Sequence, residues 1–226
     1  MIFNILSTQP QIYNSFLKTG LIARGILKKI IKIKIFNLYD FGQGKHRSID
    51  DSPYGGGAGM VLRVDILDKA ISKLKSKVKS KKVKVILLTP QGKKFSQKIA
   101  RELTKEKEVI LIAGRFEGYD ERIRELVDEE ISIGDYILID GDIAAMVLIE
   151  AISRLIPGFI QKSESLKEES FSDGFLEYPQ YTRPKNYQGK KVPSILLSGN
   201  HVKISAWRQK QAMLRSKKKR PDLIKD

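Results

Sequence analysis

An apolar run that ends abruptly in glycine constrains the fold of this chain more than any other feature. Residues Val109–Ala113 have the composition of a short buried strand, and the loop Gly114–Arg122 follows directly with two glycines and five charged residues. In open α/β sheets, ligands bind at the carboxyl edge, where such loops lie. The charged groups could bind an amine, a sugar hydroxyl or a carboxylate. A simple turn with solvated charges is the alternative interpretation.

Two more apolar segments end in the same way. Val83–Leu88 leads into Thr89–Gly92, and Tyr136–Ile139 leads into the sequence Asp140-Gly141-Asp142. Helical patterns lie between or after these segments, at Gln97–Thr104, Glu121–Val127 and Ile143–Leu155. Apolar strands alternating with helices predict an α/β fold, with a parallel sheet and helices on both faces.

The charge balance points to a polyanionic partner. The 226 residues carry a formal net charge of +16, with 41% hydrophobic residues to form a core. Phosphate neutralisation favours nucleic acid as the partner. A lysine-rich surface without a partner and a basic membrane-surface protein are the alternatives, although no apolar stretch is long enough to cross a bilayer. The lysine-rich stretch Lys73–Lys84 is interpreted as a solvated helix end and loop.

Cysteine is absent, which excludes disulfides, thiolate zinc sites and iron–sulfur clusters. The only histidines are His46 and His201, so a metal site made of imidazole groups is not expected. Residues Met1–Leu6 are interpreted as a strand and not as a signal peptide, because they lack a basic leader and a cleavage site. The predicted location is cytoplasmic.

Composition divides the chain into a main domain at 1–160, a mobile linker at 161–175 and a small basic helical domain at 176–226. Within the main domain, Asp51–Met60 contains four glycines. Because glycine has no side chain to pack, this segment is interpreted as a loop over a substrate, with a plain linker as the alternative. The basic tail from Lys203 to Lys225 predicts contact with nucleic acid, or else an ordinary surface helix.

Eight segments together resemble the bacterial tRNA (guanine-N1)-methyltransferases of the SPOUT class, the TrmD family. In chain order they are Pro53–Met60, Thr89–Gly92, Gly114–Arg122, Ser132–Tyr136, Ala144–Gly158, Ser170–Gly174, Tyr181–Pro184 and Leu197–His201. The resemblance implies a trefoil knot in the carboxyl half of the main domain and a homodimer with the active site between subunits. It also implies S-adenosylmethionine as the methyl donor.

The resemblance places the donor in the three loops. The implied donor-binding residues are Leu88, Thr89, Pro90, Gly114, Phe116, Glu117, Gly118, Ser132, Ile133, Gly134, Asp135, Tyr136, Ile137, Leu138 and Gly141. Glu117 is a candidate for the donor's amino group, its ribose or a magnesium ion. Ser132 and Tyr136 could instead be ordinary packing residues.

The implied reaction moves a methyl group to guanine N1 at position 37 of tRNA, 3′ to the anticodon. Neutral guanine carries a proton on N1, so a base must remove it, and a cation near O6 would stabilise the charge that develops. The resemblance assigns Asp173 as the base and places Arg154 against the guanine. A turn aspartate before Gly174 and a surface arginine are the alternatives.

The candidates for tRNA contact are His46, Arg47, Gly59, Arg183, Asn200, His201 and Arg208. His201 could instead be a buried structural histidine. Methylation of another RNA site and an inactive RNA-binding homologue are the alternative functions.

The chain departs from the family pattern at two places in the main domain. The family usually has Gly-Gly-Glu where this chain has Asp140-Gly141-Asp142, and it usually has Phe before Pro10, where this chain has Gln9. The first departure puts the direct contacts of Asp140 and Asp142 in doubt.

Overall fold

A computed structural model describes residues 1–78, 83–161, 169–172 and 174–224. The chain forms two compact units, Met1–Gln161 and Lys162–Asp226, and each is described by itself. Most of the predicted linker, at 162–168, and the predicted base Asp173 lie outside the described residues.

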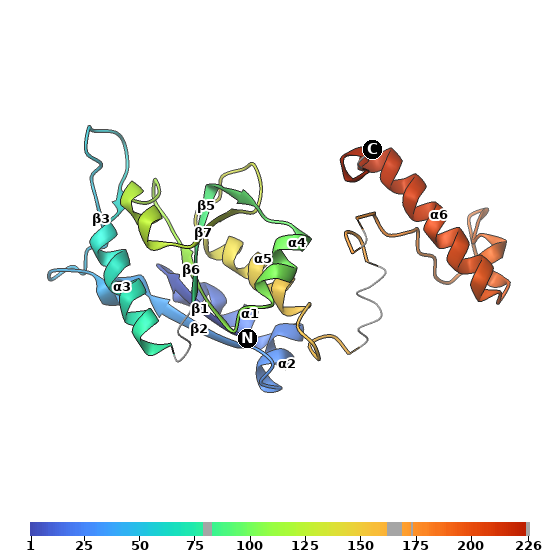
Figure 1. The fold of residues 1–226 in the computed structure, drawn as a ribbon, viewed down its shortest axis with the longest axis horizontal. Coiled ribbons are helices and arrows are strands. Elements are labelled where there is room, and N and C mark those ends of the chain that lie inside the picture. The colour runs from blue at the N-terminus through green and yellow to red at the C-terminus, as the bar shows by residue number, and fades with distance from the viewer. Residues whose placement is uncertain (79–82, 162–168, 173, 225–226) are drawn as a thin grey trace. The chain divides into compact units, whose positions relative to one another are not determined.

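The first unit is built on a five-stranded sheet in which every neighbouring pair of strands is parallel (Figure 1). In spatial order the strands are β2 (Lys32–Asn37), β1 (Ile2–Ser7), β6 (Glu108–Ala113), β5 (Lys84–Lys94) and β7 (Glu129–Ser132). The predicted parallel sheet and the N-terminal strand are confirmed. All six residues of β6 are buried, as expected of a central strand covered on both faces.

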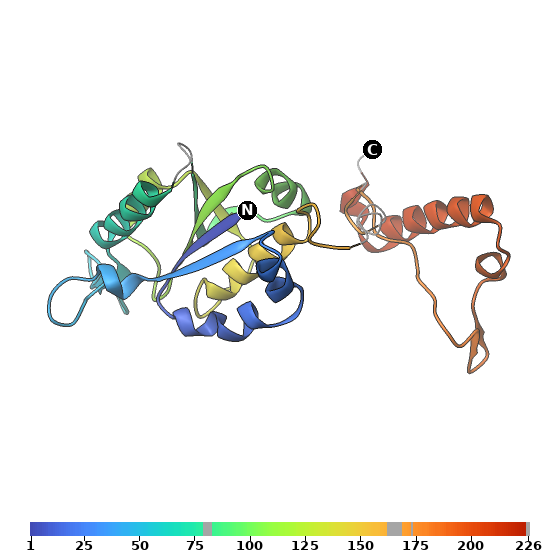
Figure 2. The ribbon, with the colours of Figure 1, turned by 90° about the horizontal axis from the view of Figure 1, so that it is seen from below.

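Helices cover both faces of this sheet (Figure 2). Alternate strand residues point to opposite cores, so Ile86 and Leu88 join one cluster while Val85 and Leu87 join the other. The first core is closed by η1 (Pro10–Tyr13), α1 (Asn14–Lys18), α2 (Gly20–Leu27), α4 (Gln97–Leu103) and α5 (Asp142–Ser153). The second core is closed by η2 (Leu38–Phe41), α3 (Val64–Lys77) and η3 (Glu121–Leu126).

The prediction of a strand at Tyr136–Ile139 is wrong. This segment is irregular and exposed, with Ile137 and Ile139 each more than four-fifths accessible. The strand of this region is β7, which begins with Glu129 and Glu130. A short apolar run looks the same whether it is a buried strand or an apolar surface segment, and the edge strand β7 needs less apolar sequence because it has only one neighbour.

Two other boundaries differ from the sequence expectation. Thr89–Gly92, expected as a loop, lies within β5, whose pairing with β7 is irregular between Leu88 and Lys93. The segment expected as a helix at Glu121–Val127 is the 3₁₀-helix η3, started by the Asp120 side chain, which accepts a hydrogen bond from the Arg122 amide. The glycine-rich segment is flanked by two short antiparallel strands, β3 (Asp50–Asp51) and β4 (Val61–Leu62).

The longest element of the second unit is the helix α6 (His201–Lys219). The unit also contains β8 (Asn186–Tyr187), β9 (Lys190–Lys191), η5 (Ser194–Leu197) and η6 (Pro221–Leu223). Asn200 begins α6 by accepting a hydrogen bond from the Lys203 amide. Ser216 is the one buried residue among the described residues of this unit, and its hydroxyl accepts a hydrogen bond from the Leu176 amide.

Candidate donor pocket and basic surface

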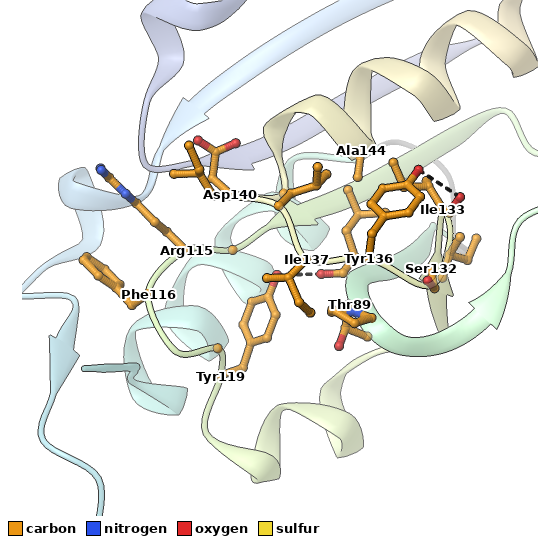
Figure 3. A pocket seen from close by; sticks show the side chains of 18 of the residues that line it. Thr89, Arg115, Phe116, Tyr119, Ser132, Ile133, Tyr136, Ile137, Asp140 and Ala144 are labelled. Carbon is orange, nitrogen blue, oxygen red and sulfur yellow. Dashed lines mark hydrogen bonds between the residues drawn. The ribbon is translucent and has the colours of Figure 1, made fainter. Parts of the chain in front are cut away.

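A cavity of about 350 Å³ opens at the carboxyl edge of the sheet (Figure 3). It lies where β6 and β7 end and where the pairing of β5 becomes irregular after Leu88, as expected of a ligand site in an open α/β sheet. Of the fifteen residues predicted to hold the donor, the cavity is lined by all but Asp135: Leu88, Thr89, Pro90, Gly114, Phe116, Glu117, Gly118, Ser132, Ile133, Gly134, Tyr136, Ile137, Leu138 and Gly141. The structure thus brings into one place three loops that are far apart in the sequence.

Main chain forms much of the wall at the end of β6. The Gly141 amide donates a 2.7 Å hydrogen bond to the Gly114 carbonyl, which joins the second and third loops. A Cβ atom at Gly141 would lie 2.9 Å from the Gly114 nitrogen, and one at Gly114 would lie 2.2 Å from the Tyr119 ring. Both positions therefore require glycine because of close packing.

Tyr119 is a lining residue that the sequence analysis did not select. The Tyr119 hydroxyl, which lies inside the cavity wall (Figure 3), donates a hydrogen bond to the Leu88 carbonyl at 3.0 Å. It also lies 3.3 Å from the Ile112 carbonyl. Burial raises the pKa of Tyr119, so the hydroxyl stays protonated and keeps its role as donor. The side chain joins β5 at Leu88 to the end of β6, an arrangement that no sequence pattern signals.

The third loop begins with a tight turn. The Ser132 hydroxyl donates to the Gly134 carbonyl at 3.0 Å and accepts from the Gly134 amide at 3.2 Å. The Tyr136 hydroxyl donates to the Ile133 carbonyl at 3.3 Å (Figure 3). Ser132 and Tyr136 therefore shape the loop as well as lining the cavity.

The glycine-rich segment meets the cavity at Glu117. A Cβ atom at Gly59 would lie 2.4 Å from the Glu117 side chain, and the Glu117 amide donates to the Met60 carbonyl at 3.0 Å. The predicted tRNA-contact residue Gly59 is thus next to a predicted donor-contact residue. This placement fits the prediction that the segment lies over a substrate.

One buried carboxyl group lies directly behind the cavity wall. Asp142 is the first residue of α5 and is fully buried, and its Oδ1 accepts a 2.7 Å hydrogen bond from the Tyr13 hydroxyl. Burial raises the pKa of Asp142 to about 6. The Tyr13 and Ser7 hydroxyls and the charge of Arg115 oppose that rise, while the nearby charge of Asp140 adds to it.

Two predicted site residues lie elsewhere. The exposed Asp135 is outside the cavity lining and forms a 3.0 Å ion pair with Lys94. Arg154 ends α5 and lines a second surface cavity together with Val147 and Glu150. Because Asp142 and Arg154 are twelve residues apart, the two ends of α5 are separated by about 18 Å. Arg154 is therefore outside the first cavity within one chain.

The predicted tRNA-contact residues belong to both units. His46 and Arg47 lie in an exposed turn of the first unit, where Arg47 pairs with Asp40 at 3.4 Å. Arg183 and His201 are exposed in the second unit, so the alternative of a buried structural His201 is wrong. The guanidinium of Arg208 lies 4.6 Å from the centre of the Tyr178 ring, and Asn200 is the helix cap described above.

Two kinds of feature are lacking in the described part of the chain. No helix there is long and apolar enough to cross a membrane. No cluster of three or more histidine, aspartate or glutamate side chains there could hold a metal ion.

A parallel sheet with a cavity walled by main chain at its carboxyl edge is typical of α/β proteins that bind a nucleotide-like ligand. Residues 1–226 match the family described as tRNA (Guanine-1)-methyltransferase TrmD, so the chain belongs to that family.

Curated relatives match over nearly their whole length. A tRNA (guanine-N(1)-)-methyltransferase of Carboxydothermus hydrogenoformans is 49% identical over 100% of this chain and 88% of its own. Proteins of the same name from Dictyoglomus turgidum and Clostridioides difficile are 47% and 44% identical, covering 98% and 100% of this chain and 89% and 98% of their own.

Proposed function

We propose that this chain transfers a methyl group from S-adenosylmethionine to N1 of guanine in tRNA, at position 37 on the 3′ side of the anticodon. The observation that carries the proposal is the gathering of the three predicted donor loops around one cavity, in a chain that matches the methyltransferase family from end to end. The basic α6 unit is proposed to bind the tRNA through its phosphates.

The cavity fits an adenosine-like donor by size and by the character of its wall. Its volume of about 350 Å³ is within the range of small-molecule sites. Main-chain groups at Leu88, Gly114 and Gly141 can meet a purine and a ribose without demanding particular side chains. Glu117 supplies a carboxylate for the donor's amino group or ribose.

The proposed chemistry needs a base and a cation. Bound S-adenosylmethionine supplies a methyl group on a positively charged sulfur. Asp173 accepts the N1 proton of guanine, the N1 lone pair forms the new N–C bond, and the C–S bond breaks to leave S-adenosylhomocysteine. Arg154 stabilises the negative charge that develops on O6 as the proton leaves.

Arg154 can play this role only in a dimer of suitable geometry. Because ten residues of helix, about 15 Å, separate it from Ala144, the lining residue nearest to it on α5, we propose that it serves the cavity of a second copy. Exposed apolar side chains on the same helix, Ile143 and Val147, offer a surface for such pairing. An active site shared between two subunits follows from this arrangement.

Two finer points of the proposal concern the knot and the magnesium ion. A trefoil knot is proposed for the carboxyl half of the first unit, where Gly141 passes against Gly114 at the end of β6. The described residues offer no cluster that fits a magnesium ion, so no step of the reaction is assigned to a metal.

The test is methyl transfer by the parent chain and by Asp173→Asn. With unmodified tRNA transcript and labelled donor, the variant should lose at least about 100-fold in turnover while it still binds both substrates. Asp68→Asn is the matched control, because its carboxylate is exposed on α3 and outside the cavity, and it should retain parental turnover.

Mapping the modified nucleotide separates the alternatives. Methylation at N1 of the guanine 3′ to the anticodon supports the proposal, and modification elsewhere supports a methyltransferase with another RNA target. A parent that binds RNA but never methylates it supports an inactive homologue. Full turnover by Asp173→Asn contradicts the assignment of the base.

A further inference from the structure

The turn that follows β1 reaches the wall of the donor cavity through two side chains. Gln9 Nε2 donates to Asp140 Oδ2 at 3.2 Å, and the Tyr13 hydroxyl donates to Asp142 Oδ1 at 2.7 Å. Tyr13 is fully buried, so its ring fixes the position from which its hydroxyl acts. These bonds join residues about 130 positions apart in the sequence.

The two acceptors, Asp140 and Asp142, lie on either side of Gly141, which contacts the end of β6. Asp140 Oδ1 also accepts the Asp142 amide at 3.0 Å, which closes the loop around Gly141. Gly141 in turn donates to the Gly114 carbonyl at 2.7 Å. Asp140 and Gly141 both line the cavity, so any movement of this loop changes the shape of its wall.

The same residues account for both places in the main domain where the sequence departs from its family pattern. Gln9 stands where the family usually has Phe, and Asp140-Gly141-Asp142 stands where it usually has Gly-Gly-Glu. In the structure Gln9 and Asp140, one residue from each departure, are partners in a hydrogen bond.

We propose that Gln9 and Tyr13 are positioning residues of the donor cavity, which hold Asp140 and Asp142 so that Gly141 stays against Gly114. This inference rests on the proposed function, because the ligand in question is S-adenosylmethionine. Neither residue is among those that line the cavity, so each acts through the loop.

The hydrogen bond from Tyr13 depends on the charge of Asp142. A hydroxyl bonds more strongly to a carboxylate than to a neutral carboxyl group. The groups that face Asp142 are the hydroxyls of Tyr13 and Ser7, the carboxylate of Asp140 and the guanidinium of Arg115. Since burial raises the pKa of Asp142 to about 6, the loop should be held less firmly as the pH falls below that value.

The experiment is calorimetric titration of the full chain with S-adenosylmethionine between pH 5.5 and 8. For Tyr13→Phe at pH 8 we expect affinity to fall about tenfold, and for Gln9→Ala about threefold, as for the loss of a charge-assisted hydrogen bond at a buried and a half-buried position. Parental affinity should fall below pH 6, and Tyr13→Phe should lack this step. Tyr39→Phe is the matched control, because Tyr39 packs in the core on the other face of the sheet.

Variants that carry the usual family residue at position 9, at position 140 or at both give a second, independent readout. Gln9→Phe and Asp140→Gly should each weaken donor binding, and the double variant should bind more tightly than the sum of the two effects predicts. Additive effects contradict the pairing of Gln9 with Asp140.

The outcomes also separate this inference from the proposed function. If the parent does not bind S-adenosylmethionine, the proposed function fails and the inference fails with it. If the parent binds but Tyr13→Phe binds within twofold of it at every pH, only the inference fails. A Tyr13→Phe variant that is weakened but keeps the parental pH step shows a general loss of structure and also overturns the inference.

Discussion

The two units of this chain present their binding groups in opposite ways. The donor cavity is walled largely by main chain and glycine, with a carboxyl group buried behind it, and its shape depends on contacts closer than a Cβ atom permits. The second unit offers a helix whose basic side chains are mostly exposed, and Ser216 is its one buried residue among those described. The first surface should therefore be sensitive to shape and the second to the number of charges.

The largest effect is expected at Arg154, the predicted catalytic side chain outside the cavity. Arg154→Ala should lower turnover about 100-fold or more with little change in donor affinity, since it removes charge stabilisation only. Steady-state methylation assays with tRNA transcript measure this.

Mixing variants decides whether Arg154 acts on a second copy of the chain. If it does, Arg154→Ala mixed with a variant of the donor cavity should regain activity, because one shared site then has both parts intact. A mixture that stays inactive after subunit exchange contradicts the shared site.

Replacing a glycine of the cavity wall by alanine should have the next largest effect. Gly114→Ala places an atom 2.2 Å from the Tyr119 ring, and the resulting shift of the loop should weaken donor binding on the order of 100-fold. Gly44→Ala is the control for backbone strain alone, because alanine is strained at its positive φ of 73° while nothing lies within 4 Å of its Cβ position. Donor titration and circular dichroism are the measurements, and equal affinities for both variants would contradict a wall made by close main-chain packing.

The buried charge of Asp142 should appear in the pH dependence of stability. Its pKa is raised from 3.8 to about 6 by folding, so the folded state binds the proton more tightly, and this contribution to stability is lost as the pH rises through 6. Between pH 5 and 8 the free energy of unfolding should lose about 1–2 kcal/mol from this group.

Asp142→Asn should remove that loss, and denaturant unfolding at several pH values measures it. Asp68→Asn, at an exposed carboxylate of α3 that does not face Asp142, should keep the parental dependence. A parental dependence in Asp142→Asn would mean that its charge is not buried in solution.

The smallest effect is expected for a single lysine of α6. Lys218→Gln should weaken tRNA binding only about twofold to threefold at moderate salt, and it should lower the slope of log affinity against log salt by about 0.7 to 0.9. Filter binding at several salt concentrations measures both. Lys69→Gln, on α3 of the first unit, is the comparison. An equal change in tRNA binding for Lys69→Gln would show that the position of the lysine does not matter.

The sequence was sufficient for the parts of the fold that depend on periodicity. The fully buried β6 and the glycine loop after it follow from Val109–Ala113 and Gly114, and the helix near Ile143 follows from its apolar pattern. Tyr136–Ile139 could not be placed, because an apolar run does not say whether protein or solvent lies beside it. The contacts of Tyr13 with Asp142 and of Gln9 with Asp140 could not be foreseen either, since pairs about 130 residues apart are set by the tertiary fold.

The exposed segment Tyr136–Ile139 has one further consequence. Ile137 and Ile139 line the donor cavity, yet most of their surface faces outward. Any apolar surface that covers Ile137 and Ile139 also contacts the wall of the cavity. If a second copy of the chain supplies that surface, association of the two copies changes the free energy of donor binding, and donor binding changes the free energy of association by the same amount. The apparent dissociation constant for the donor should then depend on the concentration of the protein itself.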